Sequence, residues 1–472
     1  MAPVRFLLNG TPRTEDRVPP TTTVLDYLRT VARLTGVKEG CAEGDCGACT
    51  IVLGRAEGGR MHYRAVNSCL MMLPQLDGAA VLTVEGLAPP DGPLHPVQQA
   101  MIESDATQCG FCTPGFVMSI FALAQEDAPM SEDDIHEALA GNLCRCTGYR
   151  SIVAACRRVA GRTEAPRIDV AAVPASPRCT RYEVDGQRFL APESLDELLA
   201  LRAAHPEALL LAGGTDLGLL VSKERRKLPL VIATANVPAL RRIEHGPDSL
   251  ILGAAVTYTE ALPHLEAAFP AFARLVRRIG SRQIRNLGTL GGNLGTASPI
   301  GDTLPCLVAL GAEVLLRSQI GARTVPIEDF LLGYRKTALQ PTEIIEAIRI
   351  PRLAPGQRLF AYKLSKRFDQ DISSVAAAYR LTVEDGIVRE LRAAYGGMAD
   401  RVKRARAVEA ALVGRPWTAA TLAEIDRAVA EDFTPLSDHR AGAAYRLRAA
   451  ANLLRRLQLE STGAALSRLE AL

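Results

Sequence analysis

The cysteines constrain this chain more than any other residue type. Nine of the eleven fall within the first 160 of 472 residues, at Cys41, Cys46, Cys49, Cys69, Cys109, Cys112, Cys144, Cys146 and Cys156. A disulfide scaffold needs an oxidising compartment, and nothing in the sequence directs the chain to one. In a reducing compartment, clustered cysteines hold metal more often than they form disulfides. The sequence therefore predicts metal centres in the N-terminal third.

Composition and charge exclude several classes of protein. Hydrophobic residues make up 48% and charged residues 23% of the chain, as in ordinary globular proteins. A formal net charge of +3 is too small to predict nucleic acid or an anionic membrane as the main partner. The best apolar run, 115–124, is far shorter than the roughly 20 residues of a spanning helix. The N-terminus, MAPVRFLLNG, has no signal-peptide architecture, so we expect a cytoplasmic protein.

The pattern along the chain predicts an α+β multidomain protein, and about 150 residues per domain gives a prior of roughly three domains. Residues 1–85 are β-rich, with a strand over 4–8 and a helix start at 23–28, and residues 86–160 contain helical stretches over 96–102, 115–125, 131–140 and 152–159. A proline-containing linker is predicted over 161–181. Residues 182–355 alternate helices with strand-like runs at 209–211, 250–252, 314–316 and 344–350, and residues 356–472 end in helices.

The first cysteine group lies in a glycine-rich loop. Cys41, Cys46 and Cys49 have the C-x4-C-x2-C spacing of plant-type [2Fe–2S] ferredoxins, and Cys69 supplies a fourth thiol. Three thiolates from one loop require tight backbone curvature, which the loop glycines permit. A four-cysteine zinc loop usually pairs C-x2-C with C-x2-C, and this spacing fits that pattern poorly. The spacing therefore favours an iron–sulfur cluster over zinc or merely buried thiols.

The second cysteine group consists of two pairs, QCGFCTPG over 108–115 and GNLCRCTGY over 141–149. Each pair precedes a predicted helix, where the positive end of the helix dipole should lower thiol pKa values and favour an anionic cluster. From these residues alone, zinc and an iron–sulfur cluster are comparable alternatives. Cys-x-Cys is awkward for tetrahedral zinc, so the spacing tilts the prediction to iron–sulfur.

Two glycine-dense turns follow short apolar runs further along. They are LLLAGGTD over 209–216 and NLGTLGGNLGTASPIGDTL over 286–304. Such turns suit the close approach of a backbone to a pyrophosphate. Taken alone they could equally be structural. The chain contains no G-x-G, so a Rossmann dinucleotide site is not expected.

Together, KEGCAEGDCGACT, QCGFCTPG and GNLCRCTGY resemble the molybdenum hydroxylase family, which includes xanthine dehydrogenases and aldehyde oxidases. The resemblance covers essentially the whole chain. It implies a plant-type ferredoxin-like β-grasp domain and a four-helix domain, each with one [2Fe–2S] cluster. The ligands would be Cys41, Cys46, Cys49 and Cys69 for the first, and Cys109, Cys112, Cys144 and Cys146 for the second. Cys156, Cys179 and Cys306 match no ligand position and are expected to be buried or surface thiols.

The glycine-dense turns resemble the family's FAD domain, which has the vanillyl-alcohol-oxidase-type fold. That resemblance implies that the pyrophosphate is wrapped by Leu210, Leu211, Ala212, Gly213, Gly214, Thr215 and Asp216. Thr289, Gly292, Asn293 and Asp302 would contact the phosphates and ribityl chain. Ile345 would line the isoalloxazine pocket and Lys363 would lie near a polar group of the cofactor. Ile279 stands where relatives can have an aromatic residue. Residues 356–472 would form the C-terminal α+β flavoprotein domain.

Two further stretches concern the electron acceptor. DFLLGYRKT over 329–337 resembles the family segment FFxGYRKT, with Leu331 in place of the second aromatic residue. LSKRFDQDIS over 364–373 resembles the mobile loop beside the flavin. Without the family, both stretches would be interpreted as solvated surface loops. With it, Tyr334 and the balanced charges over 366–371 favour NAD+ as acceptor. Arg335 could hold a phosphate or anchor an acidic residue.

The resemblance also implies a division of labour between chains. No residues are left for the family's molybdopterin portion, which is a separate polypeptide in several bacteria. We therefore expect the iron–sulfur/FAD small subunit of a bacterial xanthine dehydrogenase, in a heterotetramer of two small and two large chains. Electrons from hypoxanthine and xanthine would pass through both clusters to FAD and NAD+. The alternatives are the corresponding part of an aldehyde, nicotinate or CO hydroxylase, a stand-alone iron–sulfur flavoprotein, and a zinc-structured binding module.

Overall fold

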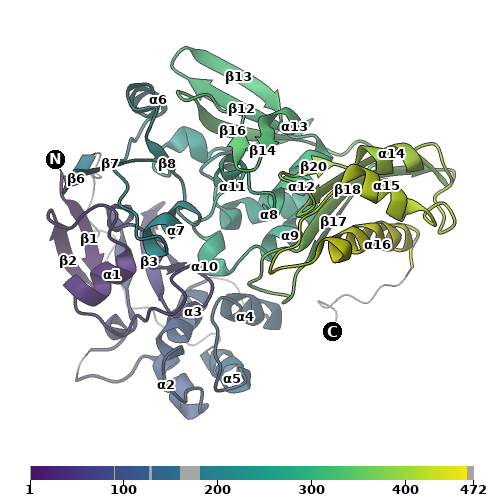
Figure 1. Cartoon of the computed structure of the whole chain (residues 1–472). Helices are drawn as coiled ribbons and strands as arrows, with labels where there is room; N and C mark the ends of the chain where they lie inside the picture. Colours follow the sequence, from purple (N-terminus) through teal and green to yellow (C-terminus); the bar gives the residue numbers. More distant parts are fainter. Residues whose placement is uncertain (1, 90, 127–129, 160–180, 465–472) are drawn as a thin grey trace. The chain divides into compact units, whose positions relative to one another are not determined.

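The computed structural model describes residues 2–89, 91–126, 130–159 and 181–464 (Figure 1). They form two compact units. The first holds Met1–Pro238 and Gly280–Gly288, and the second holds Ala239–Ile279 and Thr289–Leu472. The predicted linker over 161–181 lies outside the described residues except for Arg181, which begins a strand. The predicted flavin domain, 182–355, contributes to both units.

The first unit begins with a five-stranded mixed sheet in the order β2-β1-β5-β3-β4, in which β1 and β5 are parallel. The strands are β1 Val4–Leu8, β2 Thr11–Glu15, β3 Thr50–Glu57, β4 Arg60–Asn67 and β5 Ala80–Leu82. Alternate residues of β1 enter the core, which confirms the predicted strand. The predicted helix start is also present. Thr23 caps α1 (Val24–Asp26), which continues as a π-helical turn over Tyr27–Val31. A helix packed on a mixed sheet matches the expected ferredoxin-like domain.

Four helices follow, and all four helical predictions are confirmed. They are α2 Pro96–Glu103, α3 Thr113–Ala124, α4 Glu132–Leu139 and α5 Arg150–Val159. Ser131 and Asp134 form a capping box at the start of α4. Helix α3 is apolar on nearly every side because it lies at the centre of this bundle, where Phe116, Ile120 and Phe121 are buried.

The first unit closes with a small sheet from the flavin region, in the order β6-β7-β9-β8. Its elements are β6 Arg181–Val184, β7 Gln187–Leu190, α6 Leu195–Ala204, β8 Leu209–Leu211, α7 Leu217–Ser222, β9 Leu230–Ala233 and α10 Arg282–Arg285. Leu211, Val231 and Phe189 pack in the same core as Phe6 and Tyr27. This part of the flavin region therefore shares its hydrophobic core with the ferredoxin-like sheet.

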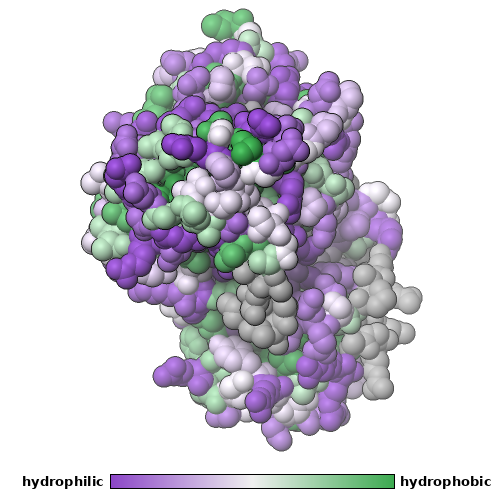
Figure 2. Space-filling model, turned by 90° about the vertical axis from the view of Figure 1, so that its right-hand side faces the viewer, coloured by the Kyte–Doolittle hydropathy of each residue, from purple (hydrophilic) through white to green (hydrophobic). Residues whose placement is uncertain are grey.

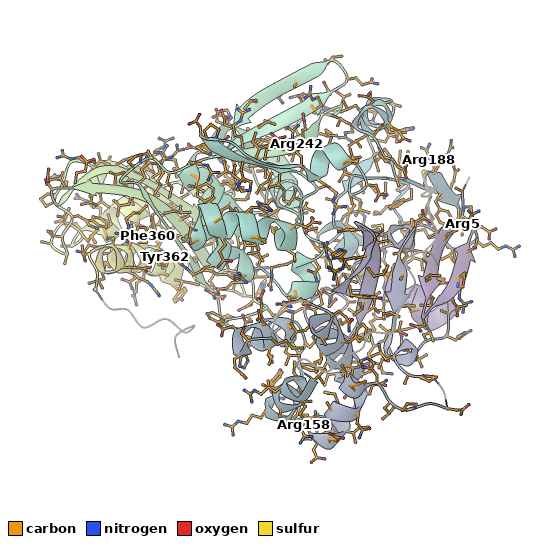
Figure 3. The ribbon with its side chains drawn as sticks, turned by 180° about the vertical axis from the view of Figure 1, so that it is seen from behind. Arg5, Arg158, Arg188, Arg242, Phe360 and Tyr362 are labelled. Atoms are coloured by element: carbon orange, nitrogen blue, oxygen red, sulfur yellow. The ribbon has the colours of Figure 1, made fainter. Side chains whose placement is uncertain are left out.

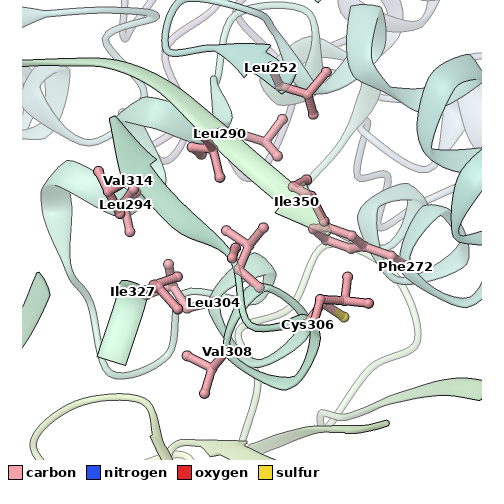
Figure 4. Close-up of a cluster of buried hydrophobic side chains, with 14 of the residues drawn as sticks. Leu252, Phe272, Leu290, Leu294, Leu304, Cys306, Val308, Val314, Ile327 and Ile350 are labelled. Atoms are coloured by element: carbon pink, nitrogen blue, oxygen red, sulfur yellow. The ribbon is translucent and has the colours of Figure 1, made fainter. Parts of the chain in front are cut away.

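The second unit contains an antiparallel sheet in the order β10-β11-β16-β12-β13. The strands are β10 Ile243–His245, β11 Ser249–Gly253, β12 Glu313–Ser318, β13 Gly321–Pro326 and β16 Ile344–Pro351. Its helices are α8 Tyr258–Ala268, α9 Pro270–Arg277, α11 Leu290–Thr296, α12 Thr303–Leu310 and α13 Ile327–Phe330, and β14 Leu331–Gly333 pairs with β15 Lys336–Thr337. Figure 4 shows their core, where Phe272, Leu304 and Ile350 meet.

A second sheet, β17-β18-β19-β20, completes this unit. Its elements are β17 Arg358–Leu364, β18 Val375–Glu384, β19 Ile387–Gly396, β20 Lys403–Arg404, α14 Arg406–Leu412, α15 Ile425–Asp432 and α16 Ala443–Ser461. Strand residues alternate between two cores. Ala378 and Ala394 face α12, whereas Tyr379 and Tyr395 face α16. Phe360 and Tyr362 lie together on β17 and belong to the α16 side (Figure 3).

Two surface properties complete the description. No helix in the described part of the chain is long and apolar enough to cross a bilayer. On the face drawn in Figure 2, hydrophilic residues predominate and hydrophobic ones are scattered among them, which is an ordinary protein surface.

A histidine pair links β10 to α8 and gives the second unit a pH dependence. His245 Nε2 and His264 Nδ1 lie 2.7 Å apart, and burial together with His245 lowers the pKa of His264. The stability from this neutral pair is full above the unfolded pKa near 6.5 and is lost as the pH falls through the lower folded value.

We therefore expect the melting temperature to fall more in the wild type than in His245→Gln between about pH 7.5 and about pH 5.5. Calorimetry at both pH values checks this. His62→Gln, which removes an exposed histidine, should follow the wild type. Identical pH dependence in His245→Gln and wild type would refute the assignment.

Candidate cofactor sites

The loop around Cys41 surrounds its sulfur with backbone N–H groups. The amides of Glu43, Asp45 and Cys46 donate to Cys41 Sγ over 3.4, 3.3 and 3.3 Å, and the Cys41 amide donates to Cys46 Sγ over 3.3 Å. The hydrogen bond from the Cys46 thiol and these amides lower the pKa of Cys41 to about 5. Positive φ angles of 79° and 69° at Gly44 and Gly47 allow this curvature. The loop is therefore built to hold an anionic sulfur.

The other two thiols of the first group lie deeper. Cys49 and Cys69 are 2% and 1% exposed, and their sulfurs are 3.3 Å apart. The side-chain amide of Asn67 donates to Cys49 Sγ over 3.7 Å. The four cysteines thus form two thiol pairs, Cys41 with Cys46 and Cys49 with Cys69.

The second group has the same arrangement with more exposure to solvent. Cys109 and Cys146 are exposed, with sulfurs 3.6 Å apart, and the Cys112 thiol hydrogen-bonds to that of Cys144. Thr147 also bonds to Cys144 Sγ through its amide and hydroxyl. The predicted lowering of thiol pKa at the helix N-terminus is wrong for Cys112. Burial raises the pKa of Cys112 to about 12, although it caps α3, because desolvation of the thiolate outweighs the helix dipole.

Both groups fit a two-iron cluster. A [2Fe–2S] cluster takes four thiolates, two for each iron, and each group presents two pairs of thiols. The two pairs of thiols at each position are therefore the ligand set that a [2Fe–2S] cluster needs.

Of the cysteines outside these groups, Cys156 and Cys306 are completely buried, in agreement with the expected core thiols. Burial raises the pKa of Cys156 to about 12 and raises that of Cys306 above its ordinary value. Cys179 lies outside the described residues.

A direct hydrogen bond joins the two cysteine groups. The amide of Leu143, next to Cys144, donates to the carbonyl of Cys46 over 3.0 Å. Beside it, Asn142 Nδ2 donates to the Gly47 carbonyl over 3.0 Å. A Cβ on Gly47 would lie 2.1 Å from the carbonyl oxygen of Gly141, so only glycine permits this approach. The loop of Cys46 and the loop of Cys144 are thus joined by one backbone hydrogen bond and one side-chain hydrogen bond.

Helix α10 contacts both cysteine domains at this junction. Gln283 is fully buried, and its Nε2 lies within 3.3 Å of Thr50 Oγ1, 3.1 Å of Ser119 Oγ and 3.1 Å of Asn142 Oδ1. Arg285, 2% exposed, donates to Glu137 over 2.6 Å. The segment that carries them lies inside the predicted flavin domain, 182–355, yet it contacts both cysteine domains at their junction.

The proposed pyrophosphate loop lies next to the first cysteine group. Leu70 follows Cys69, and its carbonyl oxygen would be 3.4 Å from a Cβ on Gly214 and 2.4 Å from one on Gly218. Gly214 has a φ of 82°, and a Cβ on Gly213 would lie 1.7 Å from the Leu287 carbonyl. These close approaches require glycine, because a side chain at Gly213 or Gly218 would overlap the carbonyl of Leu287 or Leu70. Leu210 and Leu211 end β8, Ala212 and Thr215 lie in the turn, and Asp216 occupies the N-cap position of α7.

The other proposed flavin residues belong to the second unit. Lys363 Nζ lies 2.7 Å from Asp302 Oδ2 and 2.9 Å from the Arg278 carbonyl, and Ser373 Oγ donates to Asp302 Oδ1. Asp302 and Lys363 are 8% and 6% exposed, so this is a buried ion pair. A pair already joined to its own hydroxyl and carbonyl partners gives a rigid polar wall for a cofactor.

Four more of the proposed flavin residues also belong to the second unit, namely Ile279, Thr289, Asn293 and Ile345. Thr289 caps α11 by accepting from the Gly292 amide over 2.9 Å, and Asn293 accepts from the Thr303 hydroxyl. Ile345 is 9% exposed, and its Cδ1 would be 3.4 Å from a Cβ on Gly295. Ile279 packs against the main core of this unit. The Thr289 hydroxyl is therefore engaged in the cap of α11.

The proposed acceptor segments are anchored at their ends. In the loop over 366–371, the Arg367 amide donates to Asp371 Oδ2 over 2.8 Å, and Lys366 Nζ donates to the His439 carbonyl over 2.7 Å. The guanidinium of Arg278 lies 4.3 Å from the ring centre of Phe368. In the β14–β15 hairpin, Tyr334 is 63% exposed. Tyr334 is therefore available to a planar ligand from solution.

Comparison with known families matches nearly the whole chain in four consecutive parts. Residues 6–73 match a 2Fe-2S iron-sulfur cluster binding domain and residues 83–157 a [2Fe-2S] binding domain. Residues 182–353 match the FAD binding domain in molybdopterin dehydrogenase, and 360–461 the CO dehydrogenase flavoprotein C-terminal domain. The chain belongs to the molybdenum hydroxylase family. The predicted resemblance and the predicted α+β multidomain fold are thereby confirmed.

The relatives of this molybdenum hydroxylase chain are much longer than it is. It is 34% identical to xanthine dehydrogenase of Emericella nidulans over 91% of its own length and 36% of the relative's. It is also 34% identical to aldehyde oxidase 2 of Cavia porcellus, over 91% of its own length and 37% of the relative's. The chain therefore spans little more than a third of the curated relatives that it matches.

Solved structures match more than half of the chain. A carbon monoxide dehydrogenase chain from Hydrogenophaga pseudoflava superposes with a TM-score of 0.56 at 29% identity, covering 59% of this molybdenum hydroxylase chain and 98% of its own. A chain of quinoline 2-oxidoreductase from Pseudomonas putida 86 gives 0.55 at 28% identity, over 58% and 97%. Relatives with different substrates thus share this part of the fold.

Three buried amides and an arginine of this molybdenum hydroxylase chain were not predicted from sequence. They are Asn67, Asn142, Gln283 and Arg278. Asn67 and Asn142 each stand two residues before a predicted ligand, in NSC and NLC, and that adjacency is a signal that could have found them. Gln283 and Arg278 carry no such signal because they contact residues more than 80 positions away.

Proposed function

We propose that this chain is the iron–sulfur/FAD subunit of a xanthine dehydrogenase. It would receive electrons from the conversion of hypoxanthine to xanthine and urate at a partner molybdopterin subunit, and would deliver them to NAD+. The observation that carries the proposal is the hydrogen bond from Leu143 to the Cys46 carbonyl, because it joins two cysteine groups that each contain two thiol pairs. Similarity to xanthine dehydrogenases supports the choice of substrate.

The order of the sites supports a linear path. Cys109 and Cys146 are exposed, so the second group is the accessible end for a partner. The first group is less exposed, with Cys49 and Cys69 buried, and lies between that group and the loop of Gly214 and Gly218. Bound clusters would carry single electrons and bound FAD would gather them in pairs for NAD+.

The chain's own residues hold and shield these groups. Cys41, Cys46, Cys49 and Cys69 would bind the first cluster, and Cys109, Cys112, Cys144 and Cys146 the second. The Gly213–Gly214 turn would present amides to the FAD pyrophosphate. Asp302 and Lys363 would orient a polar edge of the cofactor, and Ile345 would exclude water there.

A second candidate is the same role in a different molybdenum hydroxylase. Its support is the similarity to aldehyde oxidase 2 and to the carbon monoxide and quinoline enzymes. Substrate contacts would lie on the partner in either case. A screen of purine, aldehyde, N-heterocycle and CO oxidation by the native complex separates the two, and urate formation from hypoxanthine is the outcome expected here.

The acceptor is testable on the isolated chain. We expect NADH-dependent reduction of a dye, without purine hydroxylation, because the flavin residues are present. Tyr334→Ala should raise the Michaelis constant for NADH about two- to tenfold, since aromatic stacking contributes about 0.5–1.5 kcal/mol. Leu332→Ala is the matched control, because Leu332 is 55% exposed on the same hairpin.

Steady-state dye assays with measured flavin and iron contents check this prediction. Equal Michaelis constants for Tyr334→Ala and Leu332→Ala would contradict a role for Tyr334. Absence of any NADH oxidation by flavin-replete chain would contradict the nicotinamide acceptor itself.

A further inference from the structure

We propose that the side-chain amide of Asn67 sets the reduction potential of the first cluster by donating a hydrogen bond to the Cys49 sulfur. The inference rests on the proposed ligand role of Cys49 and goes beyond it by assigning a residue that binds no iron. Its direction follows from charge. A donor at sulfur stabilises the more negative, reduced cluster, and therefore raises the potential.

The geometry of the contact is that of an N–H···S hydrogen bond. Asn67 Nδ2 lies 3.7 Å from Cys49 Sγ, and both residues are buried, at 0% and 2% exposure. Water therefore neither competes for the sulfur nor screens the interaction. In such surroundings a hydrogen bond is stronger than in solvent, and one to a charged acceptor is roughly twice as strong as a neutral one.

The oxygen of the Asn67 side chain indicates which way the amide is turned. Asn67 Oδ1 is buried and has no hydrogen-bond partner among the described residues. Turning the amide over would place that oxygen against the sulfur, where an anionic thiolate repels it, and would leave Nδ2 without an acceptor. The orientation with Nδ2 toward Cys49 is therefore the one that suits a negatively charged sulfur.

Packing alone does not explain an asparagine here. A buried oxygen without a partner lowers stability, and leucine, similar in size, would avoid that cost. The backbone of Asn67 is held independently of its side chain, because it pairs with Thr50 in the β3–β4 ladder and its carbonyl accepts from the Leu70 amide over 3.2 Å. What the side chain adds is the contact to sulfur.

Asn67 also differs from the other donors at this site. In the described part of the chain, the other N–H groups that reach these four sulfurs belong to the backbone, from Glu43, Asp45, Cys46, Cys41, Ala48, Cys69 and Gly44. A substitution leaves those donors in place. The Asn67 amide can be removed without altering the loop.

The first experiment is an EPR-monitored redox titration of the complete chain with both clusters. Asn67→Leu is expected to lower the equilibrium constant for reduction of the first cluster by up to about tenfold, a shift of up to about 59 mV downward for one electron. The potential of the second cluster should not move. Asn67→Asp should shift the first cluster further in the same direction, because it adds a negative charge beside the sulfur.

Ser68→Ala is the matched control. Ser68 is the next residue and is fully buried, but its hydroxyl donates to the Cys49 carbonyl over 2.7 Å rather than to the sulfur. Its removal should leave the potential of the first cluster where it is in the wild type. An unchanged potential in Asn67→Leu, or an equal shift in Ser68→Ala, would overturn the proposal.

A measurement on wild-type protein covers the case in which Asn67→Leu binds no first cluster. Chain labelled with ¹⁵N in asparagine side-chain amides should show a ¹⁵N hyperfine coupling to the reduced first cluster. Absence of that coupling overturns the role of Asn67. A chain in which Cys49→Ser still holds both clusters instead overturns the ligand assignment, so the two failures are distinguishable.

Discussion

Cys41→Ser and Cys144→Ser are expected to remove different EPR signals from the reduced protein. The purified chain should contain about four irons and four acid-labile sulfides, two of each per cluster. Each variant should lose about half of both and keep the other cluster. The reason is the division of the eight thiols into two groups that share no ligand, with pairs at Cys49–Cys69 and Cys109–Cys146 in separate domains.

Iron and sulfide analysis with EPR at two temperatures measures this. Cys306→Ser is the control, since Cys306 is buried in the core of the second unit and should leave iron content unchanged. A single signal lost from both cysteine variants, or zinc in place of iron, would show that the ligand assignment is incorrect.

Lys363→Met is expected to have the second large effect. Removing the ammonium leaves Asp302 buried with no counter-charge from Lys363, and breaking a buried ion pair costs about 3–5 kcal/mol. We expect the free energy of unfolding to fall by about that amount, with loss of most of the bound FAD. Denaturant unfolding of flavin-free protein and flavin release on heating measure the two effects.

Two further variants separate stability from cofactor binding. Asp302→Asn combined with Lys363→Met removes both charges, and should recover most of the lost stability but not the flavin. Lys366→Met removes an ammonium that donates to the His439 carbonyl on an exposed loop, and should resemble the wild type. Normal flavin content in Lys363→Met would contradict the proposed contact.

The sequence was most informative where the structure is local. Thr23 and Ser131 signal helix starts through their own side chains, and the period of apolar residues over 96–159 predicts all four helices. The ligand thiols were equally accessible to prediction, because loop spacing alone brings Cys41, Cys46 and Cys49 together.

Sequence reasoning was wrong or silent where burial, or contacts between residues far apart in the chain, determine a property of the site. The helix dipole should have lowered the pKa of Cys112, but desolvation depends on packing that no local motif encodes. The domain bounds 182–355 stay a prediction, and packing adds what they do not show, since Leu211 and Val231 of this range join the core of Phe6. The contacts of Gln283 span 233, 164 and 141 positions, beyond the reach of any periodicity.

Gln283 makes the junction of the two cysteine domains depend on a part of the chain synthesised much later. Thr50 and Gln283 are separated by 233 residues, so the junction stays incomplete until most of the chain has emerged. If the chain were cut between residues 160 and 280, the same buried amide would instead hold two polypeptides together. The covalent link that now keeps Gln283 at a high effective concentration near Thr50 would be lost. Assembly of the two pieces would then depend on their concentration.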